Sequence, residues 1–351
     1  MVDLPPLRHP LVAAPMAGGP STPRLVAAVG QAGGLGFLAA GYRRPEQVGE
    51  EIRQVRQLTG ASFGVNVLLP GAARATEAEI AAYAATLRPD AQRLDVALGE
   101  PVADDDHLDE KIDLLCQERV PVVSFAFGLP TGATVERLHA AGTCVLVTVT
   151  TPDEAVAAAE TGADGVVAQG IEAGGHRGGF TDRVGVGEYG LLTLLRLVAR
   201  VSRLPVVAAG GLMDGHSVAA ALTAGATAAQ LGTAFLRCPE AGTNPVHRAV
   251  LGGSRETVVT RAFTGRRARS IVNGFASRQS TVPPPAAYPH VHRLTAPLRR
   301  AAVAAGDTET ASLWAGQGHA LIRELPAGEL VRQLAAETHT ALAATRHPPG
   351  G

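Results

Sequence analysis

The alternation of short apolar runs with helical segments is the feature that most restricts how this chain folds. Eight runs rich in Val, Ala and Leu recur in the first 231 residues, and helical patterns separate them. The runs are continuous rather than alternating polar and apolar, which is typical of parallel strands covered on both faces. Strands that alternate with helices in this way predict a (β/α)8 TIM barrel. The expected strands cover residues 11–16, 35–39, 62–68, 121–126, 144–149, 165–168, 205–209 and 226–231.

The rhythm of strand and helix is lost after about residue 236. Residues 237–325 contain three consecutive prolines and polar turns but no alternation typical of strands, and a helical pattern follows them. The sequence therefore predicts a barrel domain at residues 1–236 and an appended, mostly helical subdomain over the barrel mouth at 237–325. A terminal helix and a frayed tail are expected at 326–351.

Charge and cysteine content narrow the possible functions. The chain has 31 basic and 32 acidic residues with no long block of either sign, so neither nucleic acid nor a membrane surface is expected as a partner. Three widely spaced cysteines fit the reduced thiols of a cytoplasmic protein. No signal peptide and no apolar run long enough to span a membrane are evident. The oligomeric state stays open.

Lys111 is the single lysine among the basic residues, and this limits the chemistry. The helical pattern around it places its side chain on the polar face of a helix. Schiff-base aldolases and pyridoxal phosphate enzymes need a lysine at the site, so neither class is expected. The acidic run at residues 104–106, just before this helix, is interpreted as a solvated loop.

Active sites of such barrels lie at the carboxyl ends of the strands, and here those positions are nearly free of carboxylates. No metal site is therefore expected. Glycines, amides, one thioether and one imidazole instead suit a neutral, planar cofactor with a phosphate tail. The candidates are Met16, Asn66, Phe125, Thr148, Gln169, His176, Gly210, Gly211, Gln230, Leu231, Gly232 and Thr233.

Two glycine turns indicate where the phosphate would bind. The Gly210-Gly211 turn follows the seventh expected strand and the Gly232-Thr233 turn follows the eighth, where these barrels often bind phosphate through backbone N–H groups. Ordinary tight turns are the alternative explanation. Flavin mononucleotide (FMN) matches this arrangement, with Asn66 and Gln169 placed to hydrogen-bond the polar edge of its ring.

The loop after the sixth expected strand carries the candidate catalytic residue, His176, with glycines on both sides. Such glycines allow the backbone to approach a ligand closely. Arg177 either clamps a substrate anion or stabilises the loop through a salt bridge, and Glu172 is expected to pair with an arginine. The histidines of the appended region are expected at the surface or in packing: His290, His292 and His319.

Several of these segments together resemble the bacterial nitronate monooxygenases. The matching segments lie at residues 14–19, 32–36, 63–66, 169–178, 208–215 and 230–235, and in the appended region at 288–289 and 314–318. The run Glu-Ala-Gly-Gly-His-Arg-Gly at residues 172–178 is highly specific. The resemblance extends over nearly the whole chain.

The resemblance implies an FMN enzyme that oxidises alkyl nitronates such as propionate 3-nitronate. O2 is the co-substrate, the flavin is reduced by one electron, and a carbonyl compound and nitrite are the products. His176 matches the active-site histidine of the family. A protonated His176 would hold the anionic nitronate, whereas a neutral one would remove the α-proton of a nitroalkane. The FMN contacts would fall on Asn66, Gln169, Gly174, Gly211 and residues 230–233.

Two other functions remain open on the sequence. An NAD(P)H-dependent flavin reductase of the enoyl-acyl carrier protein or quinone reductase type would share the fold and the cofactor. No separate nicotinamide-binding motif is visible, which disfavours that alternative. A non-catalytic barrel that binds flavin or phosphate is the second, and the glycine-flanked His176 argues against it.

Overall fold

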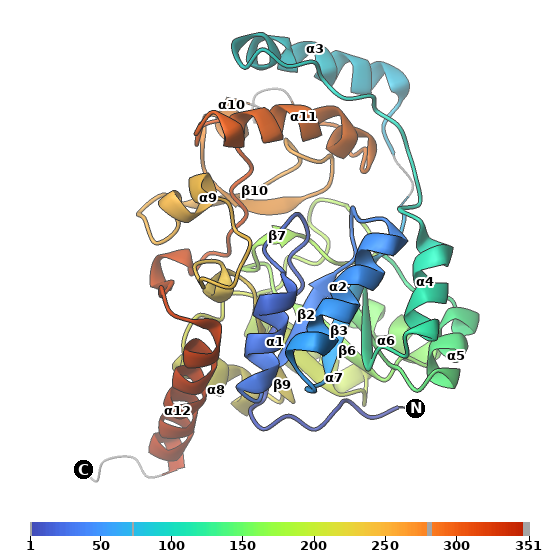
Figure 1. The fold of residues 1–351 in the computed structure, drawn as a ribbon, viewed down its shortest axis with the longest axis vertical. Helices are drawn as coiled ribbons and strands as arrows, with labels where there is room; N and C mark the ends of the chain where they lie inside the picture. Colours follow the sequence, from blue (N-terminus) through green and yellow to red (C-terminus); the bar gives the residue numbers. More distant parts are fainter. Residues whose placement is uncertain (1, 72–73, 279–282, 347–351) are drawn as a thin grey trace.

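The computed structural model of the protein describes residues 2–71, 74–278 and 283–346. Eight parallel strands close into a barrel, which confirms the (β/α)8 fold predicted from the sequence (Figure 1). The ring closes where Val12 of the first strand pairs with Gln230 of the last. Around the ring, the strands are β1 (Leu11–Ala13), β2 (Leu35–Ala39), β3 (Phe63–Leu68), β4 (Val122–Ala126), β5 (Cys144–Val149), β6 (Gly165–Gln169), β8 (Val206–Ala209) and β9 (Ala228–Leu231).

Helices between the strands cover the outside of the barrel. Local sequence explains where several of them begin. Thr22 and Thr151 each accept a hydrogen bond of 3.1 Å from a backbone N–H in the first turn, and a proline follows each of them at the first helical position. The helices are α1 (Pro23–Gln31), α2 (Pro45–Leu58), α4 (Leu108–Gln117), α5 (Gly132–Ala140), α6 (Pro152–Glu160), α7 (Leu191–Val201) and α8 (Gly215–Thr223).

Apolar side chains pack on both faces of the barrel wall. Leu11 and Ala13 of β1 belong to the cluster that contains residues of α1, whereas Val12 between them belongs to a separate cluster. Because neighbouring residues of a strand point to opposite faces, this second cluster fills the barrel interior. Apolar side chains of residues 2–7 pack against it. The barrel is therefore filled below the level of the strand ends, where the cavity begins.

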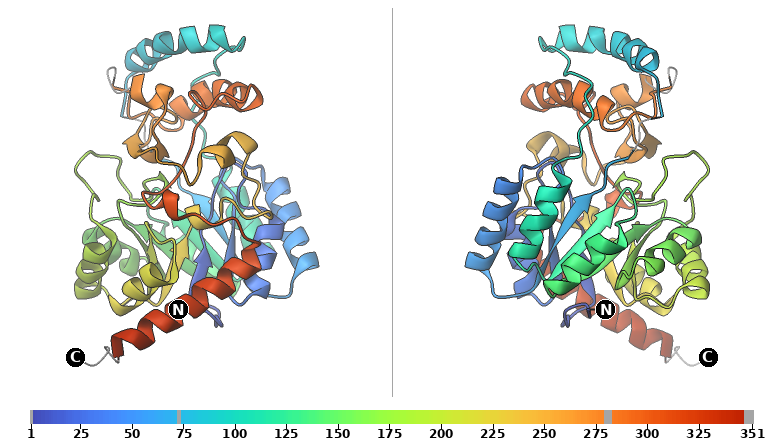
Figure 2. Two further views of the ribbon diagram at one scale, coloured as in Figure 1. Left: turned by 90° about the vertical axis from the view of Figure 1, so that its left-hand side faces the viewer. Right: turned by 90° about the vertical axis from the view of Figure 1, so that its right-hand side faces the viewer.

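A second layer lies over the carboxyl ends of the strands (Figure 2). It contains α3 (Glu77–Arg93), which follows β3 in the chain, and α11 (His290–Ala304), and the two helices pack against each other. Two shorter helices belong to the same appended segment, α9 (Pro245–Val250) and α10 (Gly274–Arg278). The last helix, α12 (Ala327–Arg346), leaves this layer and packs against α8 and α1 of the barrel.

Two strands interrupt the otherwise helical appended segment, and the sequence pattern did not predict them. β10 (Thr257–Thr260) pairs antiparallel with β11 (Ala268–Ile271), which pairs on its other edge with β7 (Gly175–His176). In this ladder His176 stands opposite Ala268. The candidate catalytic histidine is thus held by the appended layer as well as by the barrel.

The prediction that Lys111 lies on the polar face of its helix is wrong. Its side chain is 1% exposed, and Nζ lies 2.8 Å from a carboxylate oxygen of Asp106. Asp106 also accepts a hydrogen bond from the backbone N–H of Tyr42, and Asp104 forms an ion pair with Arg293 of α11. The acidic loop is therefore not simply solvated, because it joins α4, the barrel and the appended layer.

All three cysteines of the chain are unpaired. Cys116, Cys144 and Cys238 are free thiols. Burial raises the pKa of Cys144 and of Cys238 to about 12, which makes both unreactive as nucleophiles. Within the part of the chain that the structure describes, no helix combines the length and apolar character needed to cross a membrane.

Candidate active site

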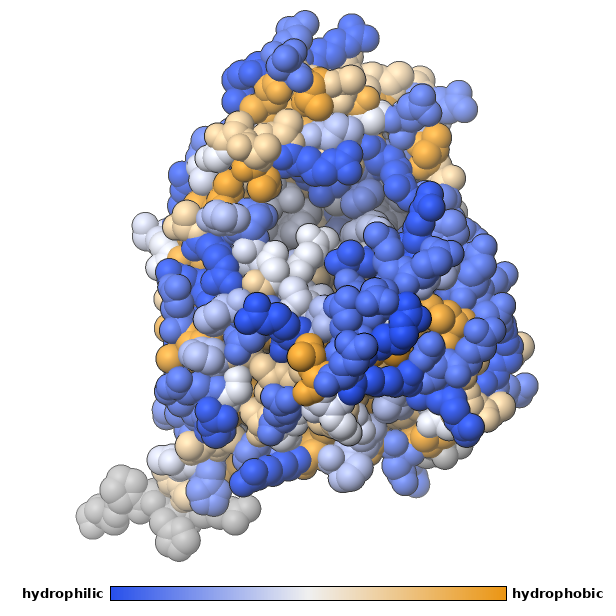
Figure 3. Space-filling view, in the orientation of Figure 1, coloured by the Kyte–Doolittle hydropathy of each residue, from blue (hydrophilic) through white to orange (hydrophobic). Residues whose placement is uncertain are grey.

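A cavity of about 350 Å³ lies between the strand ends and the appended layer, and Figure 3 shows the surface hollowed there. This size is typical of small-molecule sites. Leu231 and Phe125 do not line the cavity, because their side chains are 1% and 0% exposed and belong to apolar clusters. The other candidates line it: Met16, Asn66, Thr148, Gln169, Gly174, His176, Gly210, Gly211, Gln230, Gly232 and Thr233.

Arg177 stabilises the loop that carries His176 and does not line the cavity. Its side chain is 2% exposed, and its guanidinium donates to three loop carbonyl groups at 2.5–3.0 Å. The expected pairing of Glu172 with an arginine is wrong. Its carboxylate instead accepts a 2.9 Å hydrogen bond from the N–H of Leu191, at the start of α7, where a helix favours negative charge.

Arginines at the start of β11 hold the same loop from the appended layer. Arg266 donates to the carbonyl oxygen of Arg177 at 3.0 Å. Arg267 pairs with the carboxylate of Asp182 at 3.2 Å, and Arg269 donates to the carbonyl oxygen of Ile171 at 2.9 Å. These contacts and the β7–β11 ladder fix the backbone on both sides of the histidine.

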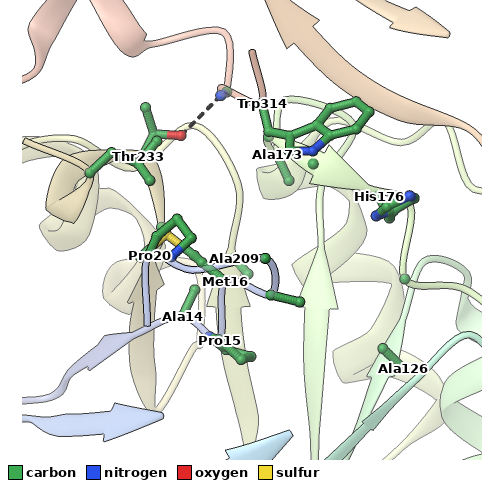
Figure 4. Close-up of a pocket in the computed structure, with 18 of the residues that line it drawn as sticks. Ala14, Pro15, Met16, Pro20, Ala126, Ala173, His176, Ala209, Thr233 and Trp314 are labelled. Atoms are coloured by element: carbon green, nitrogen blue, oxygen red, sulfur yellow. Dashed lines mark hydrogen bonds between the residues drawn. The ribbon is translucent and has the colours of Figure 1, made fainter. Parts of the chain in front are cut away.

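His176 is held as a neutral imidazole. Its Nε2 lies 2.9 Å from Oγ1 of Thr264, while its Nδ1 makes no hydrogen bond to another described residue. Burial lowers the pKa of His176 to about 3, and the cations of Arg266 and Arg299 contribute to this shift. The ring of Trp314 lies 5.4 Å away between centroids, and both side chains border the cavity in Figure 4. This environment argues against the protonated form considered from the sequence.

Three amide side chains at the strand ends differ in how many of their hydrogen-bonding groups are unpaired within the protein. Gln169 bridges the loop, since its Nε2 donates to the carbonyl of His176 and its Oε1 accepts from the N–H of Gly178. Asn66 donates from Nδ2 to Ser124, but its Oδ1 accepts from no other described residue. The amide of Gln230 makes no hydrogen bond within the described part of the chain. Asn66 and Gln230 therefore retain groups for a ligand.

The ends of β8 and β9 present unused backbone donors to the cavity wall. The N–H groups of Gly211, Leu212 and Gly232 donate to no other described residue, and all three residues line the cavity. Such N–H groups suit the oxygens of a phosphate. Thr233 is already engaged, because its Oγ1 accepts from the N–H of Gly316 at 2.9 Å (Figure 4).

The glycines of the site serve different purposes. Gly210 and Gly211 have φ angles of +119° and +72°, a backbone conformation that residues other than glycine rarely adopt. A Cβ on Gly174 would lie 2.5 Å from the backbone of Ala315, so the packing of the appended chain explains this glycine. A Cβ on Gly232 would lie 3.5 Å from Cβ of Ala14, which is ordinary contact, so protein packing alone does not require a glycine there. The unused N–H donors of Gly211, Leu212 and Gly232 fit a phosphate-tailed cofactor.

The upper wall of the cavity contains residues that sequence reasoning missed. His292, expected at the surface or in packing, lines the cavity and stacks on Tyr42 with ring centroids 4.1 Å apart. Arg299 lines the cavity beside it, and Thr264 contacts His176. Trp314 lay in a segment that carried the family resemblance, whereas no sequence signal marked Thr264 or Arg299.

The fold and the cavity at the strand ends define a TIM-barrel enzyme. The chain belongs to the nitronate monooxygenase family, whose sequence model matches residues 1–337. It is 44% identical over 344 residues to a nitronate monooxygenase of Pseudomonas aeruginosa, an alignment that covers 94% of this chain and 96% of that protein. Family membership makes the protein an oxidoreductase that oxidises nitronates.

Solved structures show the same likeness. A nitroalkane oxidase from Streptomyces ansochromogenes is 50% identical with a TM-score of 0.94, covering 97% of this chain and 98% of that one. FabK from Thermotoga maritima is 30% identical with a TM-score of 0.76, covering 97% of this chain and 96% of its own. The overall fold is therefore shared with both proteins, and more of the sequence is shared with the first.

Proposed function

We propose that this protein binds FMN and oxidises alkyl nitronates such as propionate 3-nitronate with O2, yielding a carbonyl compound and nitrite. The observation that carries this proposal is the neutral imidazole of His176, held by Thr264 at the edge of a cavity that no described carboxylate lines. When bound, FMN would supply the acceptor that takes one electron from the nitronate.

Several of the groups that would hold the cofactor are ones that the chain leaves unused. Oδ1 of Asn66 and the amide of Gln230 would bind polar atoms of the flavin ring. The N–H groups of residues 211, 212 and 232 would bind the phosphate. The proposed FMN contacts are Met16, Asn66, Gln169, Gly174, Gly210, Gly211, Gln230, Gly232 and Thr233. Leu231 is left out, because it does not line the cavity and its carbonyl oxygen accepts from the N–H of Ala14.

Thr264 allows His176 to work in either neutral tautomer. Its hydroxyl oxygen lies 2.9 Å from Nε2 of His176 and 3.2 Å from the carbonyl oxygen of Arg266, so its one proton has two possible acceptors. If Thr264 donates to Nε2, the proton of His176 is on Nδ1 and can be donated to a nitronate oxygen. If His176 donates to Thr264, a bare Nδ1 can take the α-proton of a neutral nitroalkane.

Oxygen consumption and nitrite formation with propionate 3-nitronate test the proposal. The wild-type protein should consume O2, and His176→Asn should keep its flavin and lose most turnover. His216→Asn is the matched control, because His216 is exposed on α8 and does not line the cavity. Full activity of His176→Asn would remove His176 from the mechanism, and a protein that binds no FMN would overturn the cofactor assignment.

An NAD(P)H-dependent flavin reductase, which would share the fold and the cofactor, is the second candidate. Rapid NADH oxidation without nitronate turnover would favour that function. The three free thiols are consistent with the further proposal that the enzyme works in the cytoplasm. Its proposed partners are the small-molecule nitronate and O2.

A further inference from the structure

Arg299 carries the one fixed charge among the described residues that line the cavity. No Asp or Glu side chain of the described residues lines it. Its three histidines are neutral near pH 7, because burial lowers the pKa of His176 to about 3, of His247 to about 4 and of His292 to about 2. The interior of the cavity is therefore positive around a single guanidinium.

The guanidinium of Arg299 is only partly satisfied by the protein. Its Nε donates to Oγ1 of Thr295 at 3.1 Å, and its Nη2 donates to the carbonyl oxygen and to Nδ1 of His292 at 3.2 Å. Nη1 donates to no other described residue, and none of the described carboxylates forms an ion pair with Arg299. A cation enclosed in this way is costly unless an anion and further hydrogen bonds complete its environment.

Arg299 lies on the same wall as His176. His292, which accepts from Arg299, has its ring centroid 6.1 Å from that of Tyr288, and Tyr288 in turn lies 6.0 Å from His176. The charge of Arg299 also contributes to lowering the pKa of His176. These side chains come from the appended layer and its ladder, whereas the unused N–H groups assigned to the phosphate belong to the barrel.

We propose that Arg299 binds a carboxylate at the far end of the nitronate, so that the enzyme prefers nitronates with a second anionic group over those with a neutral tail. This inference rests on the proposed function and names the residue that sets its substrate preference. A guanidinium with a free Nη1 offers a carboxylate the planar donors that suit it best. A neutral alkyl tail would leave the cation without a partner.

The test compares propionate 3-nitronate with propyl 1-nitronate, in which a methyl group replaces the carboxylate. For the wild-type protein, we expect kcat/KM to be at least about tenfold higher with propionate 3-nitronate, as for a lost charged hydrogen bond. Arg299→Met should raise KM for propionate 3-nitronate at least about tenfold and change KM for propyl 1-nitronate less than about threefold. Arg300→Met is the matched control, since Arg300 is the exposed neighbour on α11.

Each result decides the question. Equal kcat/KM values for the two nitronates in the wild-type protein overturn the assignment, and this measurement does not depend on the folding of any variant. Equal losses for both nitronates in Arg299→Met also overturn it, because they place Arg299 at the nitronate group or in a structural role. Failure of the wild-type protein to turn over either nitronate is a separate result, which refutes the proposed function and this inference with it.

Discussion

Replacing Arg177 by Met distinguishes two roles for this side chain. Arg177 either stabilises the loop around His176 by donating hydrogen bonds to its backbone carbonyl groups, or it binds the substrate. Met keeps most of the apolar stem and removes the three donated hydrogen bonds. Because Arg177 is 2% exposed, water cannot readily replace those donors. The change should therefore destabilise the protein and loosen the histidine loop.

The expected loss follows from the carbonyl groups of Gln169 and Gly187, which are left without the guanidinium donor, whereas the carbonyl of Gly170 keeps a 3.2 Å hydrogen bond from the N–H of Ala173. An unsatisfied buried acceptor costs about 1–3 kcal/mol, while removing the buried cation returns part of that cost, so we expect a net loss of about 2–4 kcal/mol. The entropy of unfolding of 351 residues is roughly 0.7 kcal/mol/K, which converts this loss into a fall of about 3–6 °C in Tm.

Thermal unfolding followed by circular dichroism, together with steady-state kinetics, separates the two roles. Arg183→Met is the control, because Arg183 is exposed in the same loop and its side chain makes no hydrogen bond to another described residue. We expect Tm and kcat to fall in Arg177→Met and to stay unchanged in Arg183→Met. An unchanged Tm with a raised KM for the nitronate would refute the loop-stabilising role and favour an anion clamp.

Three further predictions concern other parts of the molecule. Thr264→Val should lower kcat about tenfold with unchanged flavin content, and Thr264→Ser should restore it; equal activity of the two variants would show that the hydroxyl is not used. The cavity histidines have folded pKa values of about 3, 4 and 2, below the unfolded value of 6.5. The free energy of unfolding should therefore be unaffected by these histidines above pH 6.5. It should fall as the pH drops below 6.5, by at most about 1.4 kcal/mol per pH unit for each histidine. A urea unfolding midpoint that is equal at pH 7 and pH 5 would contradict this prediction. Lys111→Met should cost about 2–3 kcal/mol in chemical unfolding, since it leaves Asp106 without its cation, and Asp106→Asn in the same chain should recover part of the loss.

The sequence was sufficient to predict the barrel, because its strands are continuous apolar runs and its turns are marked by glycine and proline. The same pattern predicted where each strand ends. Because the active site of such a barrel lies at the strand ends, most of the residues that line the cavity could be predicted as well. Leu231 and Phe125 were exceptions, because their positions at strand ends did not show that their side chains face the apolar core.

Contacts between distant segments could not be predicted in the same way. β11 is four residues long and carries Arg269, so its pattern does not indicate a strand, and its pairing with β7 depends on the folded loop. Lys111 was expected in solvent because a single sequence does not show that Asp106 folds back onto it. Thr264 and Arg299 became visible as site residues only when the appended layer was placed over the strand ends.

Anaerobic mixing of the flavin-loaded protein with propionate 3-nitronate or with NADH tests the central claim most directly. The visible absorbance of the flavin reports its reduction in both cases, and no variant is needed. The account predicts rapid loss of the oxidised flavin spectrum with the nitronate and little change with NADH. Rapid bleaching by NADH together with an unchanged spectrum in the nitronate would contradict it.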